Sequence, residues 1–99
     1  MTFRSGRYTE EEVEALIEGY TELIDYRHKP YLMVRLLDVE RGTRWCSRIT
    51  RDALFFVGVL GLPLREAGIA MEVSKDTAQR RYRRGLQELT RKLNGGRSG

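Results

Sequence analysis

EAGIAMEVSKDTAQRR, the stretch Glu66–Arg81, decides the fold that we expect for this chain. It predicts a short helix, a tight turn and a second helix that begins after Ser74, because serine is a preferred N-cap residue. Gly68 lies where the two helices would cross closely, and a longer side chain there would hold them apart. Cationic and amide side chains lie where the second helix would face outward.

This second helix is amphipathic and is predicted to run to about Leu93. With Ser74 as N-cap, Lys75, Gln79 and Arg83 fall at positions i, i+4 and i+8, on one face. The opposite, buried face carries apolar residues at helical spacing, namely Ala78, Tyr82, Leu86, Leu89 and Leu93. Asn94-Gly95-Gly96 ends the helix, and we expect residues 94–99 to form a flexible tail.

The segment before this pair also has a helical pattern. Thr9 followed by Glu12 is a capping-box pattern, and apolar residues then recur at helical spacing, which predicts a helix over 10–26. Residues 1–8 are expected to be disordered or loosely docked. Pro30 suits the first turn of a second helix that Gly42 would end. Its buried side would comprise Tyr31, Val34 and Leu37, with Met33 and Leu36 as further candidates. A strand over Leu32–Leu37 is the competing interpretation, because that apolar run is continuous.

Two more helices are expected before the turn. Ser47 or Thr50 would cap a helix that runs through Leu60 and ends at Gly61, and Pro63 stops its continuation. Leu64–Met71 forms the short helix that leads into the turn. The expected fold is therefore all-α, with an N-terminal helical arm over 1–46 for oligomerisation or partner contact. A helix-turn-helix domain would cover 47–93, and a tail 94–99.

The composition limits the kinds of functional site that we expect in this chain. The 99 residues contain one cysteine and one histidine, so neither an internal disulfide nor a zinc site built from them is expected. We expect Cys46 to be a packed thiol, His28 a solvated imidazole and Trp45 a core or interface anchor. No metal, cofactor or catalytic activity is expected. There is no apolar run of about 18 residues that would span a membrane, and no hydrophobic secretion core, which indicates the cytoplasm.

Charge is unevenly distributed along the chain. Ser74–Gly99 contains eight basic and two acidic residues and carries +6, while the chain as a whole carries +4. Thr9–Asp25 contains seven carboxylates and no lysine or arginine. A concentrated basic segment favours a polyanionic partner. Phosphate would repel the acidic segment, so we expect that segment to face away from any nucleic acid, as a solvated face or a contact for a basic partner.

The basic helix has the layout of a DNA-recognition helix. The N-terminal end of such a helix contacts base edges in the major groove. Glutamine pairs bidentately with adenine, and arginine or lysine with guanine. Asp76 would either accept from cytosine or stabilise the start of the helix. Arg81 would contact phosphates, and so would either Ser47 or Arg48. The predicted DNA-binding residues are Lys75, Asp76, Gln79, Arg80, Arg83, Arg84, Arg65 and Ser74.

At these residues the chain resembles region 4 of sigma-70-type transcription factors and related phage helix-turn-helix proteins. The family pattern E-I-A-x-x-L-G-V-S-x-x-T-V corresponds here to Glu66–Ala78, followed by the basic residues Arg80–Arg84 and then Leu86 and Leu89. The resemblance covers about residues 47–93. It implies a helix-turn-helix fold and a DNA-binding function.

The chain departs from that pattern in three places. Ala67 replaces a larger apolar residue, and Glu72 replaces the usual turn glycine, where a positive φ would cost a non-glycine residue ~1 kcal/mol. Residues 1–46 resemble no other sigma region, and the domain that reads the core promoter is not present. The resemblance is therefore to an isolated region 4 module with a helical arm, not to a complete sigma factor.

Three functions are compatible with these features. The first is a sequence-specific DNA-binding regulator of transcription that binds double-stranded DNA as a homo-oligomer, because a dimer doubles the contacts of one helix-turn-helix. The second is a small terminase subunit that forms rings on viral packaging-site DNA. The third is a module that docks on RNA polymerase or a sigma factor without touching DNA.

Overall fold

Helices account for nearly all of the described chain, which is residues 7–95 of a computed structural model. No strand occurs within this range, so the all-α prediction is confirmed and the alternative strand at Leu32–Leu37 is wrong. The elements are α1 (Glu10–Glu18), α2 (Tyr20–Leu23), the 3₁₀ turn η1 (Ile24–Tyr26), α3 (Pro30–Arg44), α4 (Arg48–Ala53), the π-helix η2 (Leu54–Val59), α5 (Leu64–Met71) and α6 (Lys75–Leu93).

Side-chain caps begin three of the helices at the residues that the sequence predicts. The Thr9 hydroxyl accepts from the Glu12 amide, and the Glu12 carboxylate accepts from the Thr9 amide, which completes a capping box. Ser47 caps α4, and Ser74 caps α6. Pro30 occupies the first turn of α3, where the missing N–H removes no helical hydrogen bond.

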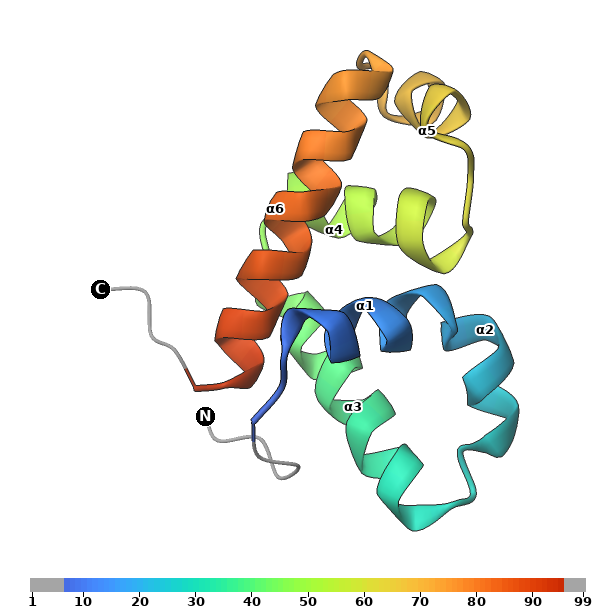
Figure 1. Cartoon of the computed structure of the whole chain (residues 1–99), viewed down its shortest axis with the longest axis vertical. Helices are drawn as coiled ribbons and strands as arrows, with labels where there is room; N and C mark the ends of the chain where they lie inside the picture. Colours follow the sequence, from blue (N-terminus) through green and yellow to red (C-terminus); the bar gives the residue numbers. More distant parts are fainter. Residues whose placement is uncertain (1–6, 96–99) are drawn as a thin grey trace.

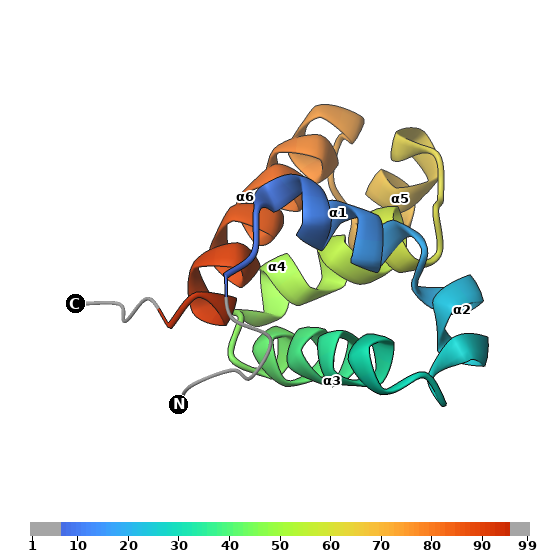
Figure 2. The same ribbon diagram turned by 60° about the horizontal axis from the view of Figure 1, so that its bottom comes forward.

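The expected first helix is divided into three pieces. α1 ends at Gly19, which has φ −96° and ψ 5°, and the chain then continues through α2 and η1 to Tyr26. The helical path therefore ends where we predict, but its direction changes between α1 and α2 (Figure 2). Ile24 and Tyr26, which follow the break, are exposed.

α3 differs from its prediction in length and in orientation. It passes through Gly42 and ends at Arg44. Gly42 faces α6, and a Cβ atom there would lie 2.7 Å from the Leu89 side chain, so this glycine allows close packing and does not end the helix. The buried face holds Leu32, Leu36, Asp38, Val39 and Gly42. The predicted inner face is confirmed at Leu36 and wrong at Tyr31 and Met33, which are 71% and 40% exposed. Val34 and Leu37 are half-buried.

The third expected helix changes its hydrogen-bonding pattern midway. α4 continues directly into the π-helix η2, where the Leu60 amide donates to the Phe55 carbonyl at 2.8 Å. Gly58 allows η2 to pack closely against α1, because a Cβ atom there would clash with the Ile17 side chain. Gly61 follows with a φ of 64°, which confirms it as the end of the helix.

α6 is the element around which the others are arranged (Figure 1). α5 lies beside its N-terminal end, α4 beside its middle, and α1 and α3 beside its C-terminal half. All five apolar residues predicted to line α6 are buried. One hydrophobic cluster joins four of them, Tyr82, Leu86, Leu89 and Leu93, to residues of α1, α3 and α4, so 7–46 and 47–95 share a core. Cys46 is in this cluster, as expected, whereas Trp45 is 60% exposed and is not a core residue.

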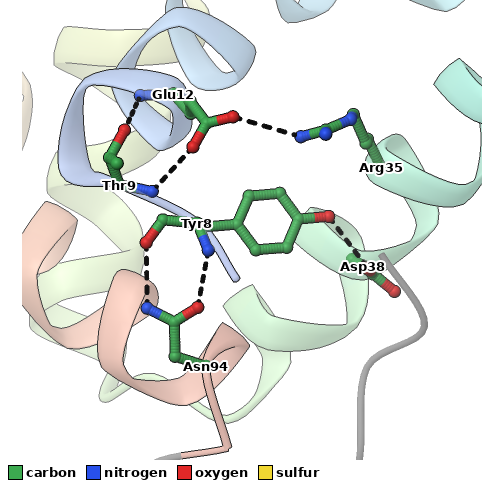
Figure 3. Close-up of polar contacts among 6 residues, drawn as sticks. All are labelled: Tyr8, Thr9, Glu12, Arg35, Asp38 and Asn94. Carbon is green, nitrogen blue, oxygen red and sulfur yellow. Dashed lines mark hydrogen bonds and ion pairs between the residues drawn. The ribbon is translucent and has the colours of Figure 1, made fainter. Parts of the chain in front are cut away.

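The chain is anchored at Tyr8, contrary to the prediction of a loosely docked segment (Figure 3). The Tyr8 amide donates to Asn94 Oδ1 at 2.7 Å, and Asn94 Nδ2 donates to the Tyr8 carbonyl at 2.9 Å. The Tyr8 hydroxyl donates to the buried Asp38 carboxylate at 2.8 Å, and the Arg35 guanidinium lies over the Tyr8 ring. The rest of the predicted N-terminal segment, residues 1–6, and the predicted tail from residue 96 lie outside the described residues.

Candidate nucleic-acid interface

The turn between α5 and α6 is closed by main-chain hydrogen bonds. The Val73 amide donates to the Gly68 carbonyl at 2.8 Å, and the Glu72 amide donates to the Ile69 carbonyl at 3.1 Å. This pair of bonds is a Schellman motif, which requires a residue in the left-handed region. Glu72 supplies it with φ 60° and ψ 43°. The glutamate therefore adopts the conformation that glycine usually adopts at this position.

Small residues allow α5 and α6 to approach closely. A Cβ atom on Gly68 would lie 2.6 Å from the Val73 carbonyl oxygen, so no larger residue fits without a shift of the backbone. Ala67 and Ala78 are each 0% exposed. The prediction that Gly68 lies at a close helix crossing is confirmed.

Ser74 holds the start of α6 in place. Its hydroxyl oxygen accepts from the Thr77 amide at 3.1 Å and also contacts Thr77 Oγ1 at 3.0 Å. Thr77 Oγ1 in turn accepts from Arg80 Nη2 at 3.0 Å. This chain of contacts fixes the first turn of α6 and orients one of its arginines.

The outward face of α6 carries the predicted side chains. Lys75, Gln79 and Arg83 are exposed, while Ala78 and Tyr82 on the other side are buried. Residues 7–46, the described part of the N-terminal half, leave these three side chains exposed. The remaining predicted residues are also exposed, namely Ser74, Asp76, Arg80, Arg84 and, in the first turn of α5, Arg65. Arg81 is half-buried, and Ser47 and Arg48 lie exposed at the start of α4.

The acidic helix α1 borders this cationic face. Glu14 Oε2 lies 3.8 Å from Arg83 Nη1, and the Tyr82 hydroxyl donates to Glu18 Oε2 at 2.7 Å. Burial, followed by this hydrogen bond to Glu18, raises the pKa of Tyr82, so its hydroxyl keeps its proton. Because α1 contacts α6 at Tyr82 and Arg83, the acidic segment does not turn wholly away from the basic helix. The rest of the cationic face, Lys75–Arg81, lies N-terminal to the contacts that Glu14 and Glu18 make with α6.

Cysteine and histidine, which often support catalysis or metal binding, occur once each in this chain. Burial raises the pKa of the Cys46 thiol from 9.0 to about 12, with a smaller contribution from Glu88. This thiol is protonated at neutral pH, which agrees with its predicted structural role. His28 is exposed, as predicted. No group of three or more histidine, cysteine, aspartate or glutamate side chains in residues 7–95 is placed to hold a metal ion.

None of the described helices combines the length and the apolar character that crossing a bilayer requires.

Comparison with known proteins adds no assignment. No protein-family model, no curated protein and no solved structure matches this chain.

Two features of this region are absent from the sequence-based set. Glu14 lies beside Arg83, and nothing in the local pattern indicates it, because 69 positions separate the two residues. Gly85 is buried in α6, and a Cβ atom there would lie 3.0 Å from Leu54. In the sequence, Gly85 lies on the apolar stripe of α6 between Tyr82 and Leu89. This position indicates a second close contact between helices.

Proposed function

We propose that this protein is a sequence-specific DNA-binding regulator of transcription that uses α5, the turn and α6 as a helix-turn-helix similar to sigma region 4. One observation carries the proposal: the N-terminal half of α6 presents Lys75, Gln79 and Arg80 to solvent, while the opposite side is sealed against the core. A helix used in this way must expose its first two turns, because those turns enter the major groove.

In this proposal the exposed residues divide into two roles. Lys75, Gln79 and Arg80 read base edges, since their amide and cationic groups match adenine and guanine in the major groove. Arg65, Arg83 and Arg84 contact phosphates and set the orientation of the protein on the duplex. Asp76 lies in the first turn of α6, where a carboxylate favours the positive end of the helix dipole. The Ser74 hydroxyl positions α6 through its cap.

The partner is double-stranded DNA, and we propose that the protein binds it as a homo-oligomer in the cytoplasm. A single recognition helix reads only a few base pairs, so a dimer gives a longer site and tighter binding. Exposed apolar side chains on α3 and after it, including Tyr31, Met33 and Trp45, offer surface for contact between subunits.

The test is the salt dependence of binding to duplex DNA, measured by fluorescence anisotropy. Four to six phosphate contacts would give a slope of log K against log salt of roughly −4 to −5. Arg84→Ala should reduce the magnitude of that slope by roughly one. The matched control is Arg91→Ala, an exposed arginine near the other end of the same helix, which should leave the slope nearly unchanged. A flat salt dependence in the unmodified protein would reject the proposal.

Light scattering of the protein with and without DNA fragments separates the alternatives. A dimer on DNA supports the regulator. A ring-sized assembly would instead support a packaging role. Undiminished function after Arg80→Ala and Arg83→Ala would indicate a module that docks on RNA polymerase or a sigma factor.

A further inference from the structure

A cavity of about 240 Å³ lies away from the basic face, between the end of α1, α3 and the α4–η2 helix. Its walls are predominantly apolar. Three of the wall residues, Ile17, Val39 and Leu54, are at most 2% exposed and belong to the hydrophobic core. The cavity therefore borders the hydrophobic core.

The π-helix η2 shapes one side of this cavity. Leu54, Phe55 and Val59 all line it. Hydrogen bonds from residue i to i+5 place Leu54 and Val59 one above the other, with Phe55 beside them. Insertions of this kind are frequently found at functional sites. Phe55 is 47% exposed, so this part of the lining is open to solvent.

The polar side chains that line the cavity already have hydrogen-bond partners within residues 7–95, with the exception of Arg51. Glu40 accepts from Arg27 Nη2 at 2.9 Å on both oxygens and also from the Tyr20 hydroxyl. The Thr43 hydroxyl donates to the Val39 carbonyl at 2.7 Å. Arg51 is exposed, lines the cavity and forms no ion pair with the described residues.

We propose that this cavity binds a small amphipathic monoanion whose apolar body lies against Leu54 and Val59 and whose anionic group pairs with Arg51. An apolar cavity of about 150 Å³ is sufficient to hold benzene. The cavity described here is larger, so it accommodates a phenyl ring or a branched aliphatic chain with a short tail that ends in a carboxylate. A polar body does not fit, because the walls offer it no hydrogen-bonding group that is free.

The cavity also shares a wall with the basic helix. Leu54 lines the cavity and faces Gly85 of α6, where a Cβ atom would lie 3.0 Å from Leu54 Cγ. An occupant would therefore contact a residue that positions α6. The binding step itself does not depend on the function proposed above, and it is tested without DNA.

The experiment is a titration of the whole protein with 3-phenylpropionate, followed by NMR of its isoleucine, leucine and valine methyl groups. We expect saturable shifts at Ile17, Val39, Leu54 and Val59. The neutral probe 3-phenylpropionamide should bind about fivefold more weakly, which is the upper limit for an exposed ion pair. Arg51→Gln should remove that difference. Arg48→Gln is the matched control, because this exposed arginine in the same helix does not line the cavity.

A second variant tests the location. Val59→Trp fills the cavity from a half-buried position and should abolish binding of both probes, and circular dichroism checks that the helices remain. The proposal is overturned if the wall methyl groups do not shift, if the amide binds as tightly as the carboxylate, or if Arg51→Gln and Arg48→Gln behave alike. Methyl shifts that follow protein concentration instead of probe concentration would also overturn it, because they would show that a second copy of the chain occupies the cavity.

Discussion

Glu14 Oε2 lies 3.8 Å from Arg83 Nη1, so the acidic helix α1 and the basic helix α6 meet on one surface. The Arg83 side chain is 58% exposed, and it remains accessible from the solvent side. A phosphate that approaches Arg83 must compete with this carboxylate. The contact therefore limits how strongly the middle of α6 binds a polyanion.

The first prediction concerns this competition. Glu14→Gln removes the competing charge and should tighten DNA binding about threefold, within the range of an exposed ion pair. Anisotropy titrations measure the change. Glu11→Gln is the control, because it removes an equal charge from an exposed position in α1 that has no ion pair with α6. Equal effects of the two variants would mean that only net charge matters.

The second prediction separates base reading from phosphate contact. Lys75→Ala or Gln79→Ala should reduce discrimination between a preferred and an unrelated duplex by ~1–3 kcal/mol. Arg84→Ala should weaken binding to both duplexes equally, since a phosphate contact carries no sequence information. Competition assays with a selected site and a scrambled site measure both effects. Unchanged site preference in Gln79→Ala would show that this face of α6 is not in the groove.

The third prediction concerns the left-handed Glu72. Glu72→Gly should increase the free energy of unfolding by roughly 0.5–1 kcal/mol, because glycine adopts this conformation without steric cost while losing more entropy on folding. Urea denaturation measures the change. Glu72→Ala keeps the strain and serves as the control. Stabilisation by alanine equal to that by glycine would point to removal of the charge as the cause.

The fourth prediction compares two buried glycines. Gly68→Ala should destabilise the fold by about 2 kcal/mol or more, because its Cβ would meet the Val73 carbonyl oxygen at 2.6 Å and the main chain must move. Gly42→Ala should cost less, since its Cβ would meet the flexible ends of Leu89 and Leu93, and alanine favours a helix. Thermal and urea denaturation of both variants provide the comparison. A larger loss at Gly42 would contradict the crossing geometry at Gly68.

The fifth prediction is a loss of stability at alkaline pH. The Cys46 thiol has a pKa of about 12 in the folded chain and an ordinary value of 9.0 when unfolded. Between these values the unfolded chain has released a proton that the folded chain retains, so the free energy of unfolding falls as pH rises from 9 to 12. Cys46→Ala should show a shallower fall in urea denaturation. It should not become flat, because burial also raises the pKa of Tyr82 and Tyr20. An unchanged slope in Cys46→Ala would exclude the thiol.

Features that depend on neighbouring residues are predictable from this sequence. Ser74 with Thr77, Thr9 with Glu12, and Pro63 before Leu64 each mark a helix boundary through local chemistry, and the structure has α1, α5 and α6 beginning there. The apolar stripe of α6 is equally clear because its outward positions are strongly polar. The candidate DNA-binding side chains follow directly from that stripe.

Features that depend on distant segments are not predictable in the same way. Apolar residues surround α3 on several sides, so periodicity alone does not decide between Tyr31 and Leu32 as the inward residue. Gly42 has the local signature of a helix end, and only its contact with Leu89 shows its role. Tyr8 and Asn94 are 86 positions apart, and their pairing follows from the packing of α1 against α6. The Glu14–Arg83 contact depends on the same packing.

The reciprocal bonds between Tyr8 and Asn94 bring the two ends of the described range into direct contact. A short peptide that joins residue 7 to residue 95 would therefore circularise the polypeptide with little distortion. New termini could then be opened at the exposed bend around His28 and Lys29. Such a permutant would retain every helix described above.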